Sequence, residues 1–385
     1  MRVGLNAISF APRRIGGMET YFRNLLAALL GQDTETEYLL LCDGKYAGEF
    51  PESGHRLQVR TFDYAPGSLK WFTRGVCRNL AGIDPLAGRI KSLPVDVIHH
   101  PFTVLTPPRS GIRSVLTFHD MQHEFYPDFF PAWELRKKRL TYRQSVEEAT
   151  RIIAISQHVK DCLVERYQAD PSVIDVIYQG CSPAYRLIHD NESIVRIRNA
   201  YGLDKPYMLY PAATWPHKNH KRLLEAISMI RDDCGFDGLL VLTGIEMQAH
   251  TVIKDEINRL GLAKQVKILG YLPTADLPAL YNCARLMVFP SLFEGFGIPL
   301  VEAMACGCPV VCAGATSLPE VVGSAGMLFD PRDAEGMAET IWSAWSDEGV
   351  LAGMRERGLE RVRLFDWDDT ARKTIAVYKK ACGAV

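Results

Sequence analysis

Residues 285–314 read RLMVFPSLFEGFGIPLVEAMACGCPVVCAG, and this stretch carries the pattern that decides the fold. A strand-like run, RLMVFPS, leads into the loop LFEGFG, and Pro299 then opens a helix pattern that Gly307 ends. A second strand-like run, PVVCAG, follows directly. Short strands that alternate with helices are typical of a parallel sheet wrapped by helices, so we expect an α/β fold.

The same alternation extends over the whole chain of 385 residues. Six strand-like runs lie in each half: 2–8, 37–42, 56–62, 95–100, 113–120 and 151–156, then 207–213, 238–244, 266–272, 285–291, 309–314 and 326–330. A chain of this length exceeds what one hydrophobic core usually organises. We therefore predict two doubly wound parallel-sheet domains, residues 1–185 and 186–365, and a final helix at about 366–385 that has no strand after it.

Composition disfavours several classes of protein. The 44 basic and 45 acidic residues nearly cancel, so the chain has no overall field that would draw it onto nucleic acid. The start, MRVGLNAISF, lacks the features of a secretory signal, and no stretch has the roughly 18 apolar residues of a spanning helix, which predicts a cytoplasmic protein. The ten cysteines form no CxxC pair, and we expect Cys306, Cys308 and Cys312 to be buried thiols rather than a metal site.

In parallel sheets of this kind, ligands bind where strands end, against the N-termini of the following helices. After the first strand, Gly16 and Gly17 precede a helix pattern whose first turn carries Glu19. Adjacent glycines let a backbone approach a ligand closely, and helix N-termini favour anions. A plain connection is the alternative. The loop is not the GxGxxG fingerprint that a nicotinamide dehydrogenase requires, so that class is disfavoured.

The loop after YMLYPAA places Lys218 at the start of the next helix, with Asn219 as the expected N-cap. A cation at a helix N-terminus opposes the helix dipole, at a cost of about 0.3 to 1 kcal/mol. A bound phosphate would turn that cost into attraction. Lys218 is therefore a candidate phosphate ligand, and a solvated lysine is the alternative.

Glu294 lies in the loop of the opening stretch, and Glu302 lies about one turn inside the helix that follows. The backbone N–H groups of Phe296, Gly297 and Ile298 lie between them. Backbone donors suit a phosphate, and a carboxylate can accept two hydroxyls of one sugar, so the arrangement suits both ends of a nucleotide sugar. Two acidic residues that only stabilise a helix N-terminus are the alternative.

Several motifs, in order, resemble the retaining glycosyltransferases of family 4. The spacing from Glu294 to Glu302 resembles the E-x7-E motif of that family. The other matching segments are RIGGMETYFRNLLAAL, VDVIHHPFTVLTPP, LTFHD, IAISQHVKDCL, PHKNHKRLLEAI and SLPEVVGSAGMLFDP, so the resemblance covers nearly the whole chain. It implies the GT-B fold, with a cleft between two Rossmann-like domains and a terminal helix that crosses back to the first. It also implies transfer of a sugar from a nucleotide diphosphate with retention at the anomeric carbon.

The resemblance implies roles for residues of the second domain. Glu302 is implied to hold the ribose hydroxyls, and Glu294 to hold hydroxyls of the donor sugar with the loop amides of Phe296 and Gly297. Lys218 is implied to meet the diphosphate. The favoured account of the family lets the leaving phosphate help to take the acceptor proton, so no side-chain base is needed. Glu294 is then a sugar-orienting residue rather than a nucleophile.

In the first domain, the resemblance implies that the Gly16 and Gly17 loop closes over the phosphates. It implies that His119, at the end of the strand RSVLTFHD, points at the donor sugar. One departure concerns Ala212, which stands where many relatives have an arginine. Phosphate neutralisation then depends more on Lys218 or on a substitute from the nearby bases His217, Lys221 and Arg13.

Two segments of the first domain are basic and contain aromatic or apolar residues. They are SLKWFTRGVCRNLAGIDPLAGRIKSLP, with Lys70, Arg74, Arg78, Arg89, Lys91, Trp71, Phe72 and Leu80, and WELRKKRLTYR, with Arg136, Lys137, Lys138, Arg139 and Arg143. Such a face suits an anionic membrane surface and a lipid-linked saccharide acceptor, which predicts a peripheral protein on the inner face of the plasma membrane. A solvated charged face is the alternative.

Two sequence patterns are similar to those of metal-binding sites. Asp366 and Asp368 fit a DxD pattern, and His119 and His123 stand four residues apart. Aspartate is a routine helix cap, and His119 closes a strand, so we expect no metal and no other cofactor.

The motifs look most like those of bacterial mannosyl- and related hexosyltransferases of surface-polysaccharide assembly. GDP-mannose is therefore the expected donor, and a saccharide or lipid-linked saccharide is the expected acceptor. The alternatives are transfer from UDP-glucose or a deoxysugar nucleotide, and a non-catalytic protein that binds a sugar nucleotide.

Overall fold

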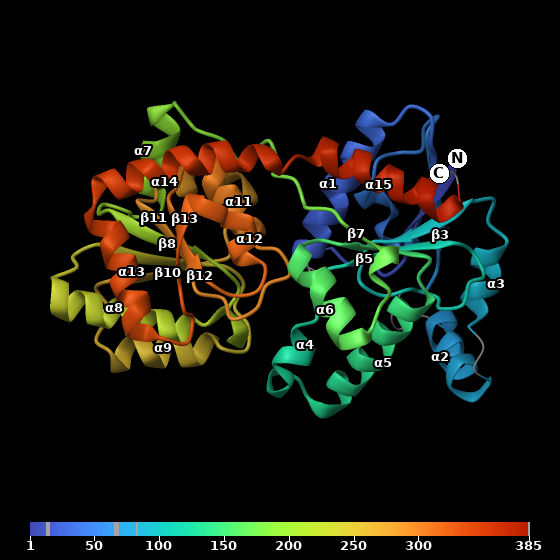
Figure 1. Cartoon of the computed structure of the whole chain (residues 1–385), viewed down its shortest axis with the longest axis horizontal. Helices are drawn as coiled ribbons and strands as arrows, with labels where there is room; N and C mark the ends of the chain where they lie inside the picture. The colour runs from blue at the N-terminus through green and yellow to red at the C-terminus, as the bar shows by residue number, and fades with distance from the viewer. Residues whose placement is uncertain (13–15, 65–68, 82–83, 384–385) are drawn as a thin grey trace. The chain divides into compact units, whose positions relative to one another are not determined.

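The structure of the chain is a computed structural model, which describes residues 1–12, 16–64, 69–81 and 84–383 (Figure 1). The chain forms two compact units, each built around its own parallel sheet. The first unit is Met1–Gly180 together with Trp367–Val385, and the second is Cys181–Asp366. The predicted α/β class is confirmed for both units.

The sheet of the first unit has seven strands in the order β3-β2-β1-β4-β5-β6-β7, and every neighbouring pair is parallel. The strands are β1 (Arg2–Ala7), β2 (Glu37–Asp43), β3 (Leu57–Phe62), β4 (Val97–His100), β5 (Ser114–Phe118), β6 (Arg151–Ala154) and β7 (Ile174–Val176). The α-helices are α1 (Gly17–Gln32), α2 (Leu69–Ala81), α3 (Pro85–Lys91), α4 (Gln122–Phe125), α5 (Ala132–Glu148), α6 (Gln157–Tyr167) and α15 (Trp367–Cys382).

Strand β7 was not predicted, whereas the other six strands of this sheet match the six predicted runs. It has only three residues, and the charged Asp175 at its centre hides the apolar pattern. The carboxylate of Asp175 pairs with Arg151 at 2.5 Å and with Lys380 at 2.6 Å. Lys380 belongs to α15, so this edge strand is held by a side chain that is remote in sequence.

Helix α15 completes the first unit. It packs along α1, and Figure 1 shows the two helices side by side. Tyr378 is fully buried, and its hydroxyl lies 2.8 Å from Nδ1 of His99 in β4. Gly180 has no room for a side chain, because a Cβ there would collide with the backbone N of Trp367. The last helix of the chain is therefore part of the core of the first unit.

The sheet of the second unit has six parallel strands in the order β10-β9-β8-β11-β12-β13. The strands are β8 (Tyr207–Pro211), β9 (Leu239–Thr243), β10 (Val266–Gly270), β11 (Leu286–Phe289), β12 (Val310–Ala313) and β13 (Gly326–Phe329), which confirms the six predicted runs. The α-helices are α7 (Asn191–Ala200), α8 (His220–Cys234), α9 (His250–Arg259), α10 (Leu277–Cys283), α11 (Ile298–Ala305), α12 (Leu318–Val322), α13 (Ala334–Ser346) and α14 (Glu348–Arg361). Because β8 and β11 are neighbours, the loops that follow them lie at the same edge of the sheet.

The core of the second unit contains the three clustered cysteines. Cys306, Cys308 and Cys312 are buried and carry free thiols. Burial raises the pKa of each thiol, so all three stay protonated near neutrality. Among the described residues, no helix is long and apolar enough to cross a membrane.

Candidate functional site

The loop after β8 leads through a 3₁₀ turn, Pro216–Lys218, into α8. Asn219 is the N-cap of α8, which confirms the prediction, although its side chain makes no cap hydrogen bond. Its Nδ2 instead donates to the carbonyl oxygens of Pro290 at 3.1 Å and Pro331 at 2.7 Å. Asn219 therefore ties together the loops that follow β8, β11 and β13.

Lys218 and Glu294 form the charged centre of the site in the second unit. Nζ of Lys218 lies 2.5 Å from Oε1 of Glu294, and the two side chains are only 16% and 14% exposed. The buried hydroxyl of Tyr210 donates to the carbonyl O of Lys218 at 2.6 Å, which fixes the lysine backbone. Nζ also lies 5.6 Å from the ring centroid of Phe289, within reach of a cation–π interaction. The ion pair was not predicted from the sequence, because its partners lie 76 positions apart.

Three basic residues were named as substitutes for the arginine that is absent at Ala212, and their environments differ. Burial, and then the nearby Lys218, lower the pKa of His217 to about 3, so this side chain is uncharged near neutrality. Lys221 is exposed at the start of α8. Arg13 lies outside the described residues. Lys218 is therefore the cation that the second unit places beside Glu294.

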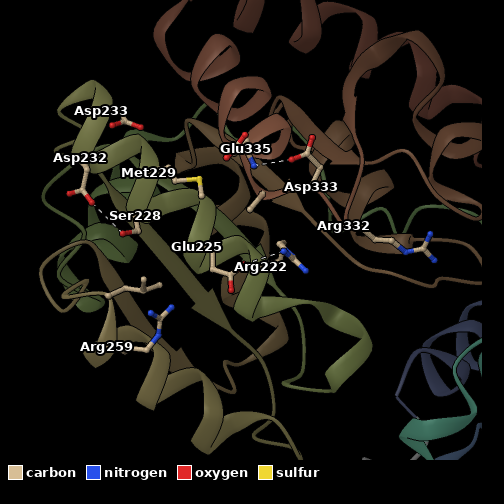
Figure 2. A pocket seen from close by; sticks show the side chains of 12 residues that line it. Arg222, Glu225, Ser228, Met229, Asp232, Asp233, Arg259, Arg332, Asp333 and Glu335 are labelled. Atoms are coloured by element: carbon tan, nitrogen blue, oxygen red, sulfur yellow. Dashed lines mark hydrogen bonds and ion pairs between the residues drawn. The ribbon is translucent and has the colours of Figure 1, made fainter.

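A separate hollow of about 580 Å³ lies along α8, α9 and the start of α13 (Figure 2). In it, Nη1 of Arg222 lies 3.5 Å from Oε2 of Glu225. Its three arginines are outnumbered by five acidic residues, so it carries no excess of positive charge for an anion. The residues that line it are Arg222, Glu225, Ser228, Met229, Asp232, Asp233, Arg259, Leu260, Arg332, Asp333, Ala334 and Glu335. None of the predicted site residues is among them.

Two hydroxyl residues after β12 hold the loop that carries Glu294. Oγ1 of Thr316 accepts a hydrogen bond from the backbone N–H of Glu294 at 3.2 Å. The buried hydroxyl of Ser317 lies 3.0 Å from the carbonyl O of Glu294 and 2.9 Å from that of Phe296. The ring of Phe296 packs on Phe365, with centroids 5.7 Å apart. Thr316 and Ser317 were not predicted from the sequence, although both residues follow a strand at the predicted ligand edge of the sheet.

Gly297 marks the turn from this loop into α11. Its φ is 103°, and a Cβ would lie 2.7 Å from Cδ2 of Leu318, so conformation and space both require glycine. The helix begins at Ile298, which puts Pro299 at the second helical position rather than the predicted first. The first amides of a helix have no acceptor within it, so the amide of Ile298 is placed to bind an anion.

Glu302 lies one turn inside α11. Its Oε2 accepts a hydrogen bond from the hydroxyl of Tyr281 at 3.0 Å, and Tyr185 also hydrogen-bonds the carboxylate. Burial raises the pKa of Glu302 to about 7, and the two hydroxyls oppose that rise. Neither tyrosine was singled out from the sequence, because aromatic residues at these positions are indistinguishable from ordinary core residues.

The remaining predicted residues belong to the first unit. Gly16 is the N-cap of α1, with a φ of 52°, and Gly17 is the first residue of the helix. A Cβ at either position would meet no atom within 4 Å, so the requirement at Gly16 is the backbone conformation and not the space. Residues 13–15, directly before them, lie outside the described part of the chain.

His119 follows β5 and is buried. Its Nε2 lies 2.7 Å from the carbonyl O of Pro101. A carbonyl only accepts, so Nε2 carries the proton and Nδ1 is the acceptor nitrogen. Burial lowers the pKa of His119 to about 4, so the ring is neutral at physiological pH. The arrangement allows Nδ1 to accept a hydrogen bond from a hydroxyl.

A buried network of polar side chains lies next to His119. The ring of Tyr21 meets the imidazole edge-on at 4.9 Å between centroids, and its hydroxyl lies 3.1 Å from Oγ1 of Thr117. The same Oγ1 lies 2.8 Å from Nε2 of His99, whose Nδ1 contacts the hydroxyl of Tyr378. These contacts link α1, β5, β4 and α15. The residues involved are too far apart in sequence for local patterns to predict the contacts.

The histidine pair considered as a metal-like pattern has separate partners. His119 bonds Pro101, whereas Nε2 of His123 lies 3.1 Å from the hydroxyl of Tyr167. Asp366 ends the second unit and Asp368 lies in the first turn of α15. Within the described ranges, no group of three or more His, Cys, Asp or Glu side chains is placed to hold a metal ion.

The structure corrects the description of Arg74 as part of an open basic face. Its guanidinium makes hydrogen bonds of 2.7 to 3.1 Å with the carboxylate of Asp84, and the two side chains are only 12% and 6% exposed. Arg74 is therefore neutralised within the first unit. Lys70 pairs with Asp63 at 2.8 Å. The side chains of Trp71, Arg78 and Leu80 lie outside what the structure describes.

Helix α5 does present an outward face with both cations and apolar groups. Trp133 and Leu140 are 69% and 63% exposed. Arg136 and Lys137 are exposed as well. The four residues are spaced i, i+3, i+4 and i+7, so they share one side of the helix.

Two family models match the chain, and together they span most of it. Residues 15–185 match the model of Glycosyltransferase Family 4, and residues 193–361 match that of Glycosyl transferases group 1. The chain is 31% identical to O-antigen chain mannosyltransferase B of Escherichia coli over 284 residues, which cover 74% of each protein. It is also 31% identical over 238 residues to the serotype-specific mannosyltransferase WbdA of Escherichia coli, but that match spans 60% of this chain and only 28% of WbdA.

Among solved structures, HepE from Anabaena in complex with UDP and glucose superimposes with a TM-score of 0.76, at 22% identity. The match covers 99% of this chain and 100% of HepE, and it supports the GT-B fold. Family models cover both units, and a relative above 30% identity covers most of the chain. The chain therefore belongs to glycosyltransferase family 4 and is a glycosyltransferase with the GT-B fold.

Proposed function

We propose that this glycosyltransferase moves mannose from GDP-mannose to a saccharide or lipid-linked saccharide, with retention of configuration at the anomeric carbon. The observation that carries the proposal is the pairing of Lys218 with Glu294 at the ends of β8 and β11, at the N-terminus of α11. A cation and helix amides suit the diphosphate, and an adjacent carboxylate suits the hydroxyls of the sugar.

In the second unit, Lys218 and the amide of Ile298 bind the diphosphate of the donor. Glu294 orients the sugar through its hydroxyls, with the amides of Phe296 and Gly297. Thr316 and Ser317 support this role because they hold the backbone on both sides of the Glu294 side chain. Glu302 binds the ribose hydroxyls one helical turn away.

In the first unit, the neutral ring of His119 binds a hydroxyl of the donor sugar through Nδ1. A protonated ring would add a positive charge beside a sugar that gains oxocarbenium character, so the neutral state suits the reaction. The loop at Gly16 and Gly17 binds phosphate oxygens through its backbone and the N-terminus of α1.

The chemical step requires stabilisation of the departing nucleotide diphosphate. Negative charge grows on this group as the bond to the sugar breaks, and Lys218 with the helix amides stabilises it. A phosphate oxygen takes the acceptor proton, so Glu294 orients the sugar and forms no covalent intermediate. Because Lys218 and the amides supply the positive potential, the reaction proceeds without a metal ion.

The choice of mannose is supported by two relatives whose names describe mannosyltransferases. UDP-glucose and deoxysugar nucleotides are the competing donors.

The acceptor side of the proposal concerns the outward face of α5. Trp133, Leu140, Arg136 and Lys137 together form an apolar and cationic surface of the first unit. Such a face binds the interface of an anionic bilayer, where a lipid-linked acceptor is available.

A thermal-shift panel of nucleotides and nucleotide sugars tests the donor. A specific donor at about 100 times its Kd adds about 2.7 kcal/mol to the free energy of unfolding. GDP-mannose is expected to stabilise the wild type and to lose most of this effect in Lys218→Ala, with Lys221→Ala as the matched control. Stabilisation by UDP-glucose or dTDP-sugars and not by GDP-mannose would refute the donor assignment. NMR analysis of the transferred mannose must show the α-anomer.

A further inference from the structure

The carboxylate of Glu302 lies among aromatic and thiol side chains. The hydroxyl of Tyr281 in α10 donates to Oε2 at 3.0 Å, and the hydroxyl of Tyr185 bonds the same carboxylate. Both tyrosines are buried, with ring centroids 5.9 Å apart and planes at 71°. The thiols of Cys181 and Cys306 are the other titratable groups that face it. No cationic side chain of the described residues contributes to the ionisation of Glu302.

Asn282 fixes the positions of the two tyrosines relative to each other. Its Nδ2 donates to the carbonyl O of Arg186 at 2.9 Å, and its Oδ1 accepts from the N–H of Ile188 at 2.9 Å. Tyr281 directly precedes Asn282 in α10, and Tyr185 directly precedes Arg186. The two hydrogen bonds therefore fix the segment 185–188 against the helix that carries the other tyrosine.

The same segment also packs on the end of α11. A Cβ at Gly307, just after that helix, would lie 2.7 Å from Cδ2 of Leu187. Residues 185–188 thus lie against both α10 and the helix that carries Glu302. Burial raises the pKa of Tyr281 well above its ordinary range, so its hydroxyl remains a hydrogen-bond donor at any pH of interest.

We propose that Tyr185 and Tyr281 are positioning residues for the donor, because their hydroxyls hold Glu302 in the orientation and the ionised state that accept the ribose hydroxyls. This inference rests on the role of Glu302 in the proposed function. A carboxylate has about four acceptor positions. Two phenol hydroxyls occupy part of that capacity and leave room for both hydroxyls of a ribose.

The arrangement couples donor binding to a proton. Without a cation nearby, Glu302 gains its ionised form only through hydrogen-bond donors, and burial places its pKa at about 7. Ribose hydroxyls donate to the ionised carboxylate, so donor binding releases a proton. The donor KM therefore falls as the pH rises through the pKa of Glu302. Removal of a tyrosine hydroxyl removes a donor, which raises that pKa and moves the fall in KM to higher pH.

The test is steady-state kinetics with varied donor over about pH 5.5 to 9, on the full chain and four variants. Tyr185→Phe and Tyr281→Phe are each expected to raise the donor KM about tenfold at neutral pH, with kcat within about twofold of wild type. Each also moves the midpoint of the KM profile upward by about one pH unit. Glu302→Gln has a raised KM without this pH dependence.

Tyr201→Phe is the matched control. Its hydroxyl donates to a carboxylate of the same unit, Oδ2 of Asp276, at 2.6 Å, outside the candidate site. It is expected to keep the wild-type KM profile, even where it lowers the melting temperature. A general loss of packing would move Tm in all three tyrosine variants but would not move the KM midpoint.

The outcomes separate this inference from the proposed function. If Glu302→Gln raises KM while Tyr185→Phe and Tyr281→Phe keep the wild-type profile, the positioning role is wrong and the ribose site stands. If Glu302→Gln leaves donor KM unchanged, the ribose role of Glu302 fails, and the positioning role fails with it. The wild type alone supplies a further check, because a donor KM that is independent of pH around 7 overturns the proton coupling, even where a tyrosine variant does not fold.

Discussion

Replacement of Lys218 by alanine tests the ion pair at the centre of the candidate site. In the wild type, Nζ of Lys218 and Oε1 of Glu294 lie 2.5 Å apart, and about five-sixths of each side chain is buried. Loss of one partner costs about 3 to 5 kcal/mol for a fully buried pair and about 0 to 1 kcal/mol for an exposed one. For this partly exposed pair we expect the free energy of unfolding to fall by about 2 kcal/mol, which corresponds to a decrease of about 4 to 8 °C in Tm.

The double variant Lys218→Ala with Glu294→Ala separates the pair from its surroundings. It leaves no unpaired carboxylate, so we expect it to regain about 1 kcal/mol relative to Lys218→Ala alone. Lys221→Ala removes an exposed lysine three residues further on, and its free energy of unfolding should stay within about 0.5 kcal/mol of wild type. Glu294→Ala alone completes the double-mutant cycle, and thermal unfolding of the five chains in one buffer measures it.

The same variant has a kinetic consequence. Because charge grows on the departing diphosphate, Lys218 interacts more strongly in the transition state than in the ground state, and Lys218→Ala should lower kcat by about 100-fold or more. Steady-state kinetics with varied donor measures this. The reasoning is refuted if Lys218→Ala and Lys221→Ala have the same Tm, or if Lys218→Ala changes donor KM and leaves kcat near wild type.

Three further outcomes are expected. Transfer activity should persist in EDTA, and complete loss that Mg²⁺ or Mn²⁺ restores would contradict the role given to Lys218 and the helix amides. Substitution of Arg136 and Lys137 by glutamine together with Trp133→Ala should weaken binding to anionic vesicles and leave donor KM unchanged. If the variant sediments with vesicles as the wild type does, the α5 face is a solvated charged face and does not bind membrane. Glu302 binds its proton more tightly in the folded chain, so its contribution to the free energy of unfolding should fall by about 3 kcal/mol as pH rises from about 4.5 through about 7. The buried histidines His119 and His217 act in the opposite direction over this range, so the fall is measured in urea titrations without nucleotide as the difference between wild type and Glu302→Gln.

Local pattern in the sequence was sufficient for the fold class and for the parts of the site that follow strands. The apolar runs before Lys218 and before Glu294 predict β8 and β11, and the ends of parallel strands predict where ligands bind. Gly297 was identifiable for the same reason, since a turn between a strand and a helix requires a residue that tolerates positive φ. These features depend on residues that are close in the chain. The short strand β7 was not predicted, because it has too few residues for an alternating apolar pattern to appear.

Tertiary structure alone decided which of these residues meet. Lys218 and Glu294 are 76 positions apart, and they pair because the strand order of the second sheet makes β8 and β11 neighbours. Tyr185 reaches the carboxylate of Glu302 from a segment whose own sequence carries no sign of a ligand. Arg74 shows the converse, since its place in a basic run suggested an open face, yet a contact with Asp84 neutralises it. Sequence periodicity reports which side of an element is apolar, whereas the partner of a charged side chain is set by how the elements pack.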